Sequence, residues 1–235
     1  MIETTLSADQ TQRTPYHIPW RARLFRWFVL PLFRIIFLVL CRVKITGLEY
    51  VPKQGSYIIA HNHVSLFEPP LLMSFWPTQP EAIAGADVFE RPGQKLLVRG
   101  YGAIPVHRGE YDRKVIDNML WVLKSGKPLV IAPEGGRSHT PGLRQARAGV
   151  AYIMDRAGVP VVPVGISGTL DDMGRNALRL KRPVLEMCIG KPFMLPPIEG
   201  RGEQRRAARQ KNADLVMRHI ASLLPEEYRG VYTPL

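Results

Sequence analysis

A histidine and a carboxylate stand five positions apart in the segment NHVSLFE, residues 62–68, which follows the apolar run Tyr57–Ala60. Histidine titrates near neutrality, so His63 has the chemistry of a general base. Glu68 would accept the Nδ1–H of the ring, fix its tautomer and leave Nε2 to take a proton from a substrate hydroxyl. The spacing alone decides little, because most histidines near a carboxylate make only a structural hydrogen bond.

Three later segments also fall at the ends of predicted strands, and two of them carry groups that bind anions: GAIPVHR at 102–108, PEGGRS at 133–138 and VPVGIS at 162–167. Arg108 and Arg137 bring planar guanidinium groups that can hold a phosphate through two parallel hydrogen bonds. Gly135 and Gly136 let backbone N–H groups approach an anion closely. Ligands of open α/β sheets gather at the carboxyl ends of strands, so one shared site is predicted. Taken singly, Arg108 could equally form a surface ion pair and the glycines a plain turn.

The wider pattern predicts the α/β class, with a mostly parallel or mixed central sheet flanked by helices. Predicted strands cover 42–46, 57–60, 128–132, 159–164 and 184–189, and predicted helices cover 69–76, 146–157 and 204–224. A further helix is predicted to begin after Asp112 as its cap and to close at Lys124 and Gly126. Each catalytic candidate then lies at a strand end.

The stretch from Trp20 to Cys41 is aromatic, leucine-rich and basic, and no Asp or Glu occurs between Gln10 and Leu48. Its apolar part is too short to span a bilayer, which takes about 20 residues, and Pro31 and Arg34 interrupt it. An amphipathic helix lying in an anionic membrane interface is favoured. A helix packed on the core with snorkelling arginines, or a tilted or re-entrant insertion, would also fit. The expected divisions are a flexible leader at 1–19, this helix at 20–44, and a main domain at 45–235 that includes the C-terminal helix.

The bulk composition indicates a folded chain with an anionic partner. The 235 residues are 46% hydrophobic, enough for a substantial core, and the formal net charge is +12. Such charge suits nucleic acid, an anionic membrane surface or phosphorylated substrates, or it is only a solvated surface. We expect no nucleic-acid partner, because no binding module is recognisable. Cys41 and Cys188 lack metal-ligand spacing and are expected to be reduced and buried, as in a chain facing the cytoplasm, and no secretory signal is evident.

Together the four blocks resemble the glycerolipid acyltransferases, typified by 1-acylglycerol-3-phosphate acyltransferase, from about Gly47 to Ile189. The family's Asn-His-x4-Asp is matched by Asn62 and His63, with Glu68 at the acid position, and its Gly-x-Ile-Pro-Val-x-Arg is matched in full by residues 102–108. Its Pro-Glu-Gly-Thr-Arg-Ser is matched by residues 133–138 except that Gly136 replaces threonine, and its Val-Pro-Val-Gly-like strand by residues 162–165.

The resemblance implies a membrane-associated enzyme that moves a fatty acyl group from coenzyme A or acyl carrier protein to a hydroxyl of a lysophospholipid. It implies His63 as the base and Glu68 as its orienting partner. The residues that would bind the phosphate-bearing acceptor or shape its pocket are Asn62, Arg108, Glu134, Gly135 and Arg137. We expect no cofactor and no metal. Because a thioester is already activated, no protein nucleophile is needed. The expected location is the cytoplasmic face of the cell membrane, as a peripheral or monotopic protein.

Two other classes stay open. A catalytically silent lipid-binding protein is supported by Glu68, whose extra methylene departs from the family's aspartate. The replacement of threonine by Gly136 also removes a hydroxyl from the acceptor side. A metal-dependent hydrolase could use His61 and His63, whose side chains point to the same side of a strand end, with Glu68, His107 or His139 completing the site.

Overall fold

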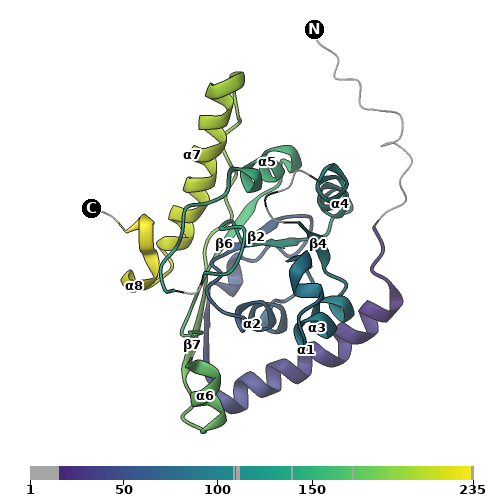
Figure 1. Ribbon diagram of the computed structural model, residues 1–235, viewed down its shortest axis with the longest axis vertical. Helices are drawn as coiled ribbons and strands as arrows, with labels where there is room; N and C mark the ends of the chain where they lie inside the picture. Colours follow the sequence, from purple (N-terminus) through teal and green to yellow (C-terminus); the bar gives the residue numbers. More distant parts are fainter. Residues whose placement is uncertain (1–15, 108, 110–111, 139, 171, 234–235) are drawn as a thin grey trace.

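Figure 1 presents the protein as a computed structural model, which describes residues 16–107, 109, 112–138, 140–170 and 172–233. Its centre is a seven-stranded sheet in the order β1-β7-β6-β2-β5-β3-β4. The strands are β1 (Arg42–Thr46), β2 (Ile58–His61), β3 (Glu81–Gly85), β4 (Ile104–Val106), β5 (Leu129–Ile131), β6 (Val161–Ser167) and β7 (Val184–Ile189). All neighbours run parallel except β6 and β7, which are antiparallel. The predicted α/β class with a mixed central sheet is confirmed.

Helices cover both faces of the sheet, and the central strand β2 shows why. Ile58 and Ala60 belong to the cluster built with α4 (Arg113–Lys124), α5 (Ala148–Ala157) and α7 (Gly202–Ala221). Ile59 belongs to the cluster with α1 (Trp20–Leu40) and α2 (Glu68–Phe75) on the other face (Figure 1). Successive side chains of a strand point to opposite faces, so a strand covered on both sides reads as an unbroken apolar run.

Most predicted elements exist within two or three residues of their predicted bounds. Asp112 caps α4 as expected, because its carboxylate accepts hydrogen bonds from the N–H groups of Lys114 and Val115. Among the strands and α-helices of the described residues, five were not predicted: β3, β4, α3 (Gln94–Tyr101), α6 (Met173–Leu178) and α8 (Glu226–Arg229). All five are eight residues or shorter, so they carry little periodic signal.

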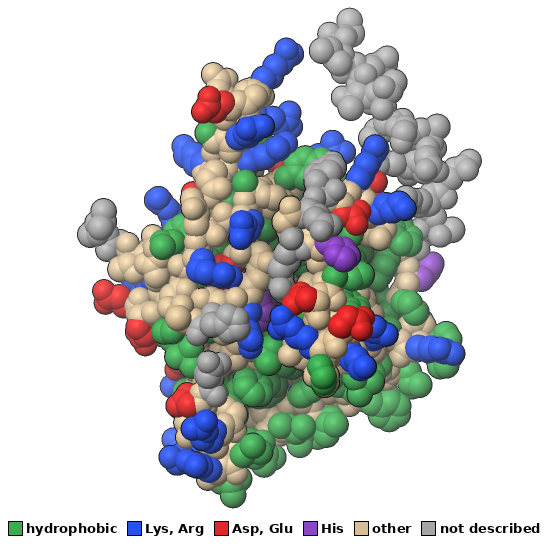
Figure 2. Space-filling view, in the orientation of Figure 1, with side chains coloured by type: hydrophobic (Ala, Val, Ile, Leu, Met, Phe, Trp, Pro, Cys, Tyr) green, Lys and Arg blue, Asp and Glu red, His purple; other side chains and the backbone are tan. Residues whose placement is uncertain are grey.

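Helix α1 is packed on the domain along one side and exposed along the other. Ala22, Arg26 and Phe37 are buried. The opposite side bears large exposed apolar residues, namely Trp20, Leu24, Trp27, Phe28, Leu32, Ile35, Leu38 and Val39. Figure 2 shows hydrophobic side chains gathered along the lower edge of the molecule, where α1 runs. Of the described helices, none has the length and hydropathy needed to cross a bilayer.

A buried ion pair ties α1 to the sheet. The Arg26 guanidinium donates to both carboxylate oxygens of Glu81 in β3, at 2.8 and 2.7 Å, and both side chains are fully buried. Its Nε donates to the carbonyl of Tyr101 at 2.9 Å, and its charge lies 4.0 Å from the centroid of that ring. The helix is therefore joined to β3 and α3 by a satisfied charge network.

Two expectations about the chain's organisation differ in detail from the structure. The expected boundary between residues 44 and 45 falls inside β1, so the end of the predicted N-terminal segment is part of the sheet. Both cysteines are free, but only Cys41 is buried, and the expected burial of Cys188 is wrong. Cys188 lies in β7, where residues alternate between a covered and a half-covered face. Most of the expected leader lies outside the described residues.

Candidate active site

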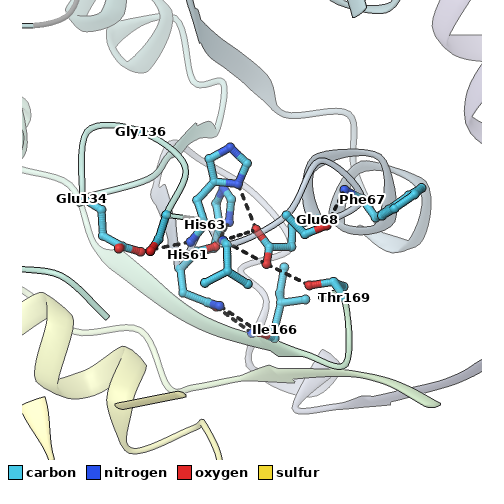
Figure 3. Close-up of polar contacts among 12 residues, drawn as sticks. His61, His63, Phe67, Glu68, Glu134, Gly136, Ile166 and Thr169 are labelled. Atoms are coloured by element: carbon cyan, nitrogen blue, oxygen red, sulfur yellow. Dashed lines mark hydrogen bonds and ion pairs between the residues drawn. The ribbon is translucent and has the colours of Figure 1, made fainter. Parts of the chain in front are cut away.

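His63 and Glu68 meet just beyond the carboxyl end of β2. Nδ1 of His63 lies 2.8 Å from Oε2 of Glu68, where β2 has ended and α2 begins (Figure 3). The His63 side chain is 17% exposed whereas that of Glu68 is fully buried. A substrate can therefore reach the ring, while the carboxylate is sealed behind it. This is the arrangement of a base and its orienting acid.

Glu68 is held by hydrogen bonds on both of its oxygens. The N–H of Val64 lies 3.1 Å from Oε1 and 2.9 Å from Oε2, and the hydroxyl of Thr169 donates to Oε1 at 2.9 Å. Glu68 is also the first residue of α2, where the helix dipole favours negative charge. Burial nevertheless raises the pKa of Glu68 to about 7, against which these hydrogen bonds act.

Asn62 connects β2 to its neighbour β6. Its side-chain N–H donates to the carbonyl of Ile166, and its side-chain oxygen accepts from the Ile166 N–H, both at 2.8 Å. The residue is fully buried. These are the contacts of a positioning residue, because they fix the backbone immediately before His63.

Glu134 holds the same backbone from the other side. Its Oε1 accepts from the N–H of His63 at 3.1 Å, and its Oε2 accepts from the N–H of Arg144 at 3.2 Å. Burial raises the pKa of the Glu134 carboxyl. The carbonyl of His63 in turn accepts from the N–H of Ser138 at 2.8 Å. The loop at 133–138 thus clamps the histidine loop through two hydrogen bonds to His63 itself.

Arginines surround the two glycines of this loop. Gly135 has a φ of 74°, and a Cβ there would lie 2.8 Å from Cγ of Arg147, so both backbone and space require glycine. Arg144 donates to the Gly136 carbonyl. Arg137 is half-buried in the same loop. A cavity of about 450 Å³ opens beside them, and its lining includes Glu134, Arg144, Gln145, Arg147 and Gln210.

In the alternative metal site His61 could offer only Nε2, because a local contact engages its Nδ1. Nδ1 of the buried His61 lies 2.6 Å from the carbonyl oxygen of Asn62 and donates to it. Burial lowers the pKa of His61 to about 4, helped by the charge of His63. Among the described residues, no three His, Cys, Asp or Glu side chains gather as metal ligands. His139 lies outside the described residues.

The structure brings together most of the site residues expected from the sequence. Asn62 and His63 lie on the loop after β2, Glu68 begins α2, and Glu134, Gly135 and Arg137 lie on the 133–138 loop that contacts His63. Arg108 lies outside the described residues. Sequence reasoning missed Thr169, Arg144 and Arg147. A polar residue soon after the buried strand β6 was the available signal for Thr169, but the sequence did not reveal that β6 pairs with β2.

A family model described as "Acyltransferase" matches residues 42–167, which is more than half of the chain and includes His63, Glu68 and the 133–138 loop. The chain belongs to the acyltransferase family. The predicted resemblance is therefore confirmed, while the glutamate in place of aspartate is a feature of this chain that the match does not address.

Among curated proteins, the chain is 32% identical over 150 residues to the lyso-ornithine lipid O-acyltransferase of Pseudomonas aeruginosa, covering 63% of this chain and 55% of that protein. It is 28% identical over 142 residues to a 1-acyl-sn-glycerol-3-phosphate acyltransferase of Cocos nucifera, covering 59% and 46%. The matches thus span about half the length of these relatives. The crystal structure of the 1-acyl-sn-glycerophosphate acyltransferase PlsC from Thermotoga maritima shares the fold, with a TM-score of 0.61, 23% identity, and coverage of 88% and 83% of the two chains.

Proposed function

We propose that this chain transfers a fatty acyl group from a thioester, carried by coenzyme A or acyl carrier protein, to a hydroxyl of a lysophospholipid such as 1-acylglycerol-3-phosphate. The observation that carries the proposal is the 2.8 Å contact between His63 Nδ1 and Glu68 Oε2 at the carboxyl edge of the sheet. With the carboxylate ionised, Nδ1 carries the hydrogen and donates it to Oε2, so the lone pair of the ring is on Nε2.

The reaction then needs one base and no protein nucleophile. Nε2 of His63 takes the proton of the acceptor hydroxyl while the hydroxyl oxygen attacks the thioester carbonyl carbon. The carbon–sulfur bond breaks as the tetrahedral intermediate collapses, and the leaving thiolate takes the proton from His63. Glu68 stabilises the transient imidazolium, and a positioned base of this kind contributes about 10²–10⁴-fold to the rate.

Asn62 and Glu134 serve this chemistry by holding His63 in place, through the Ile166 backbone and the His63 N–H respectively. The phosphate of the acceptor is assigned to Arg137 and, by the family resemblance, to Arg108. Arg147, which lies against Gly135, adds further positive charge at the same loop.

The membrane supplies the acceptor in this proposal. The exposed apolar side of α1, with Trp20, Trp27 and Phe28 at its N-terminal half, would lie in the interface of an anionic membrane, with the protein peripheral or monotopic on its cytoplasmic face. Packing of the other side of α1 onto the sheet would keep the site at a fixed height above the bilayer.

The test is thiol release from a labelled acyl-CoA by the purified chain with a panel of acceptors that includes 1-acylglycerol-3-phosphate and lyso-ornithine lipid. His63→Ala should lower kcat by about 10²-fold or more. His17→Ala, at an exposed histidine ahead of α1, is the matched control and should keep full activity.

The two alternatives predict different results in the same assay. No acceptor-dependent thiol release by the intact chain would favour the silent lipid-binding protein. Loss of activity on treatment with a chelator, restored by a divalent cation, would favour the metal-dependent hydrolase.

A further inference from the structure

A second cavity of about 450 Å³ lies at the edge of the sheet opposite His63. Tyr57 and Pro128, which line it, directly precede β2 and β5, and Gln79 lies shortly before β3. These three strands are parallel, so their amino ends share one edge, whereas His63 follows the carboxyl end of β2. The cavity is therefore separate from the candidate active site.

The lining of this cavity is basic. It includes Arg23 from α1, Lys53 from the loop before β2, and Lys127 from the turn before β5, and it includes no Asp or Glu. Within the described part of the chain, none of these three side chains takes part in an ion pair or hydrogen bond. Such convergence of cations without a protein partner attracts an anion.

The cavity is continuous with the exposed apolar side of α1. Trp27 lines it and is also 65% exposed. Arg23 lies one helical turn before Trp27 on the same flank, and Leu24 and Phe28 extend the apolar surface beside them. A ligand with a phosphate at one end and an apolar tail at the other would contact the basic cavity and the apolar side of α1 at the same time.

We infer that this cavity binds the phosphate headgroup of an anionic membrane phospholipid, as a non-catalytic site that orients α1 on the bilayer. Lys53, Lys127 and Arg23 contact the phosphate, while the chains of the same lipid stay in the bilayer beside Trp27. Thr78, also in the lining, is exposed, so its hydroxyl can contact the glycerol or headgroup oxygens. The inference rests on the membrane association proposed above and is independent of the acyl-transfer chemistry.

The experiment compares vesicle binding by two full-length double variants that lose the same charge. Lys53→Gln/Lys127→Gln removes two cavity lysines, and Lys114→Gln/Lys211→Gln removes two exposed lysines on α4 and α7. Vesicles are made of phosphatidylcholine alone or of equal parts phosphatidylcholine and phosphatidylglycerol. A lysine near an anionic surface contributes about 1 kcal/mol, so the cavity variant should bind the anionic vesicles roughly tenfold or more weakly.

The control variant should bind the anionic vesicles within about twofold of the intact chain, because distant charges are screened. Binding to phosphatidylcholine vesicles and thiol release with a dispersed short-chain acceptor should be unchanged in both variants. Equal losses in the two variants would overturn the cavity site alone. Failure of the intact chain to bind any vesicle would overturn both the cavity site and the proposed membrane association.

A titration with soluble glycerol 3-phosphate distinguishes a lipid headgroup from a free phosphate ester. We expect weak binding to the intact chain that is weakened further in the cavity variant, because the same lysines contact the phosphate. Tight binding that is lost only in the cavity variant would show a site for a soluble metabolite and would overturn the assignment to membrane lipid.

Discussion

Thr169 donates its hydroxyl hydrogen to Oε1 of Glu68 at 2.9 Å, on the opposite carboxylate oxygen from the one that faces His63. The glutamate is one methylene longer than the family's aspartate, and it folds back toward Val64 so that this residue's N–H contacts both of its oxygens. Thr169 then holds the remaining side of the carboxylate. The three contacts fix the plane of the carboxylate and hence the position of the ring (Figure 3).

Replacing Thr169 by valine should weaken catalysis through the carboxylate. Valine keeps the shape of threonine but removes a hydrogen bond to a charged group, worth about 1.5–3 kcal/mol. Because this hydrogen bond stabilises the ionised form of Glu68, its removal should raise the pKa of Glu68 further. The acid limb of the pH profile of kcat should then move to higher pH. Thr169→Ser should restore the limb. If the acid limb of the pH profile does not move in Thr169→Val, Thr169 contributes only packing and does not act on the carboxylate.

Substitutions at Glu68 should follow a fixed order of activity: intact chain, then aspartate, then glutamine. Glu68→Asp keeps the charge, but its reach toward His63 is about one bond shorter. Glu68→Gln keeps the size but presents an amide to the ring, and kcat should fall toward the roughly 10⁴-fold loss known for a catalytic-triad acid changed to its amide. Steady-state kinetics with a saturating acceptor measures the order. Glutamine equal to or better than aspartate would remove the carboxylate from the mechanism and favour the silent lipid-binding protein.

Acyl transfer should decline as the pH falls below about 7. Burial raises the pKa of Glu68 from an ordinary 4.5 to about 7, so below that pH the proton-accepting pair is lost. A pH profile of kcat measures this, and activity that stays flat down to about pH 5 would contradict it.

The raised pKa of Glu68 also predicts that the folded state becomes less stable as the pH rises. A carboxyl whose pKa is raised by folding contributes stability that is fully present below its unfolded pKa and is lost as pH rises through the folded value. Glu68→Gln, which cannot ionise, should therefore raise Tm relative to the intact chain more at about pH 8 than at about pH 5. An equal Tm difference at both pH values would show that burial costs the ionised carboxylate little.

Much of this site could be predicted from sequence because its parts are local. His63 and Glu68 are five residues apart, and a strand that ends in a short loop before a helix brings them together. The unbroken apolar runs at β2, β5 and β6 indicate strands covered on both faces, which predicts an α/β sheet flanked by helices.

The contacts that hold this pair come from far along the chain and could not be predicted. Thr169 is 101 residues from Glu68, and Asn62 is 104 residues from Ile166. Both pairings depend on β6 lying beside β2, which periodicity does not specify. β3 was not predicted for a related reason. Its first residue is Glu81, and the burial of that carboxylate is explained by Arg26 and Tyr16, which lie 55 and 65 residues earlier.

Arg137→Ala should weaken binding of a phosphorylated acceptor. Removing a charge-assisted hydrogen bond costs about 1.5–3 kcal/mol, which corresponds to a rise in acceptor KM of roughly tenfold to a hundredfold. Arg137→Lys should recover only part of this, because an ammonium group lacks the planar fork. The measurement is KM for 1-acylglycerol-3-phosphate beside that for an uncharged acceptor. An acceptor KM that does not change in Arg137→Ala would refute a phosphate role.

Breaking the Arg26–Glu81 pair should destabilise the fold far more than breaking an exposed pair. Arg26→Met leaves Glu81 buried without its cation, and Tyr16, whose hydroxyl donates to the same carboxylate at 2.9 Å, cannot replace that charge. The expected loss is about 3–5 kcal/mol in the free energy of unfolding.

The exposed pair Lys44–Glu186, at 3.0 Å, provides the matched comparison. Lys44→Met should cost about 1 kcal/mol or less. The double variant Arg26→Met/Glu81→Leu removes both buried charges together and should recover most of the loss, because apolar side chains of similar size pay no desolvation cost. Chemical denaturation of the four proteins measures these differences. If the double variant is as unstable as Arg26→Met, the loss comes from the packing of α1 against Tyr101 and not from an uncompensated charge.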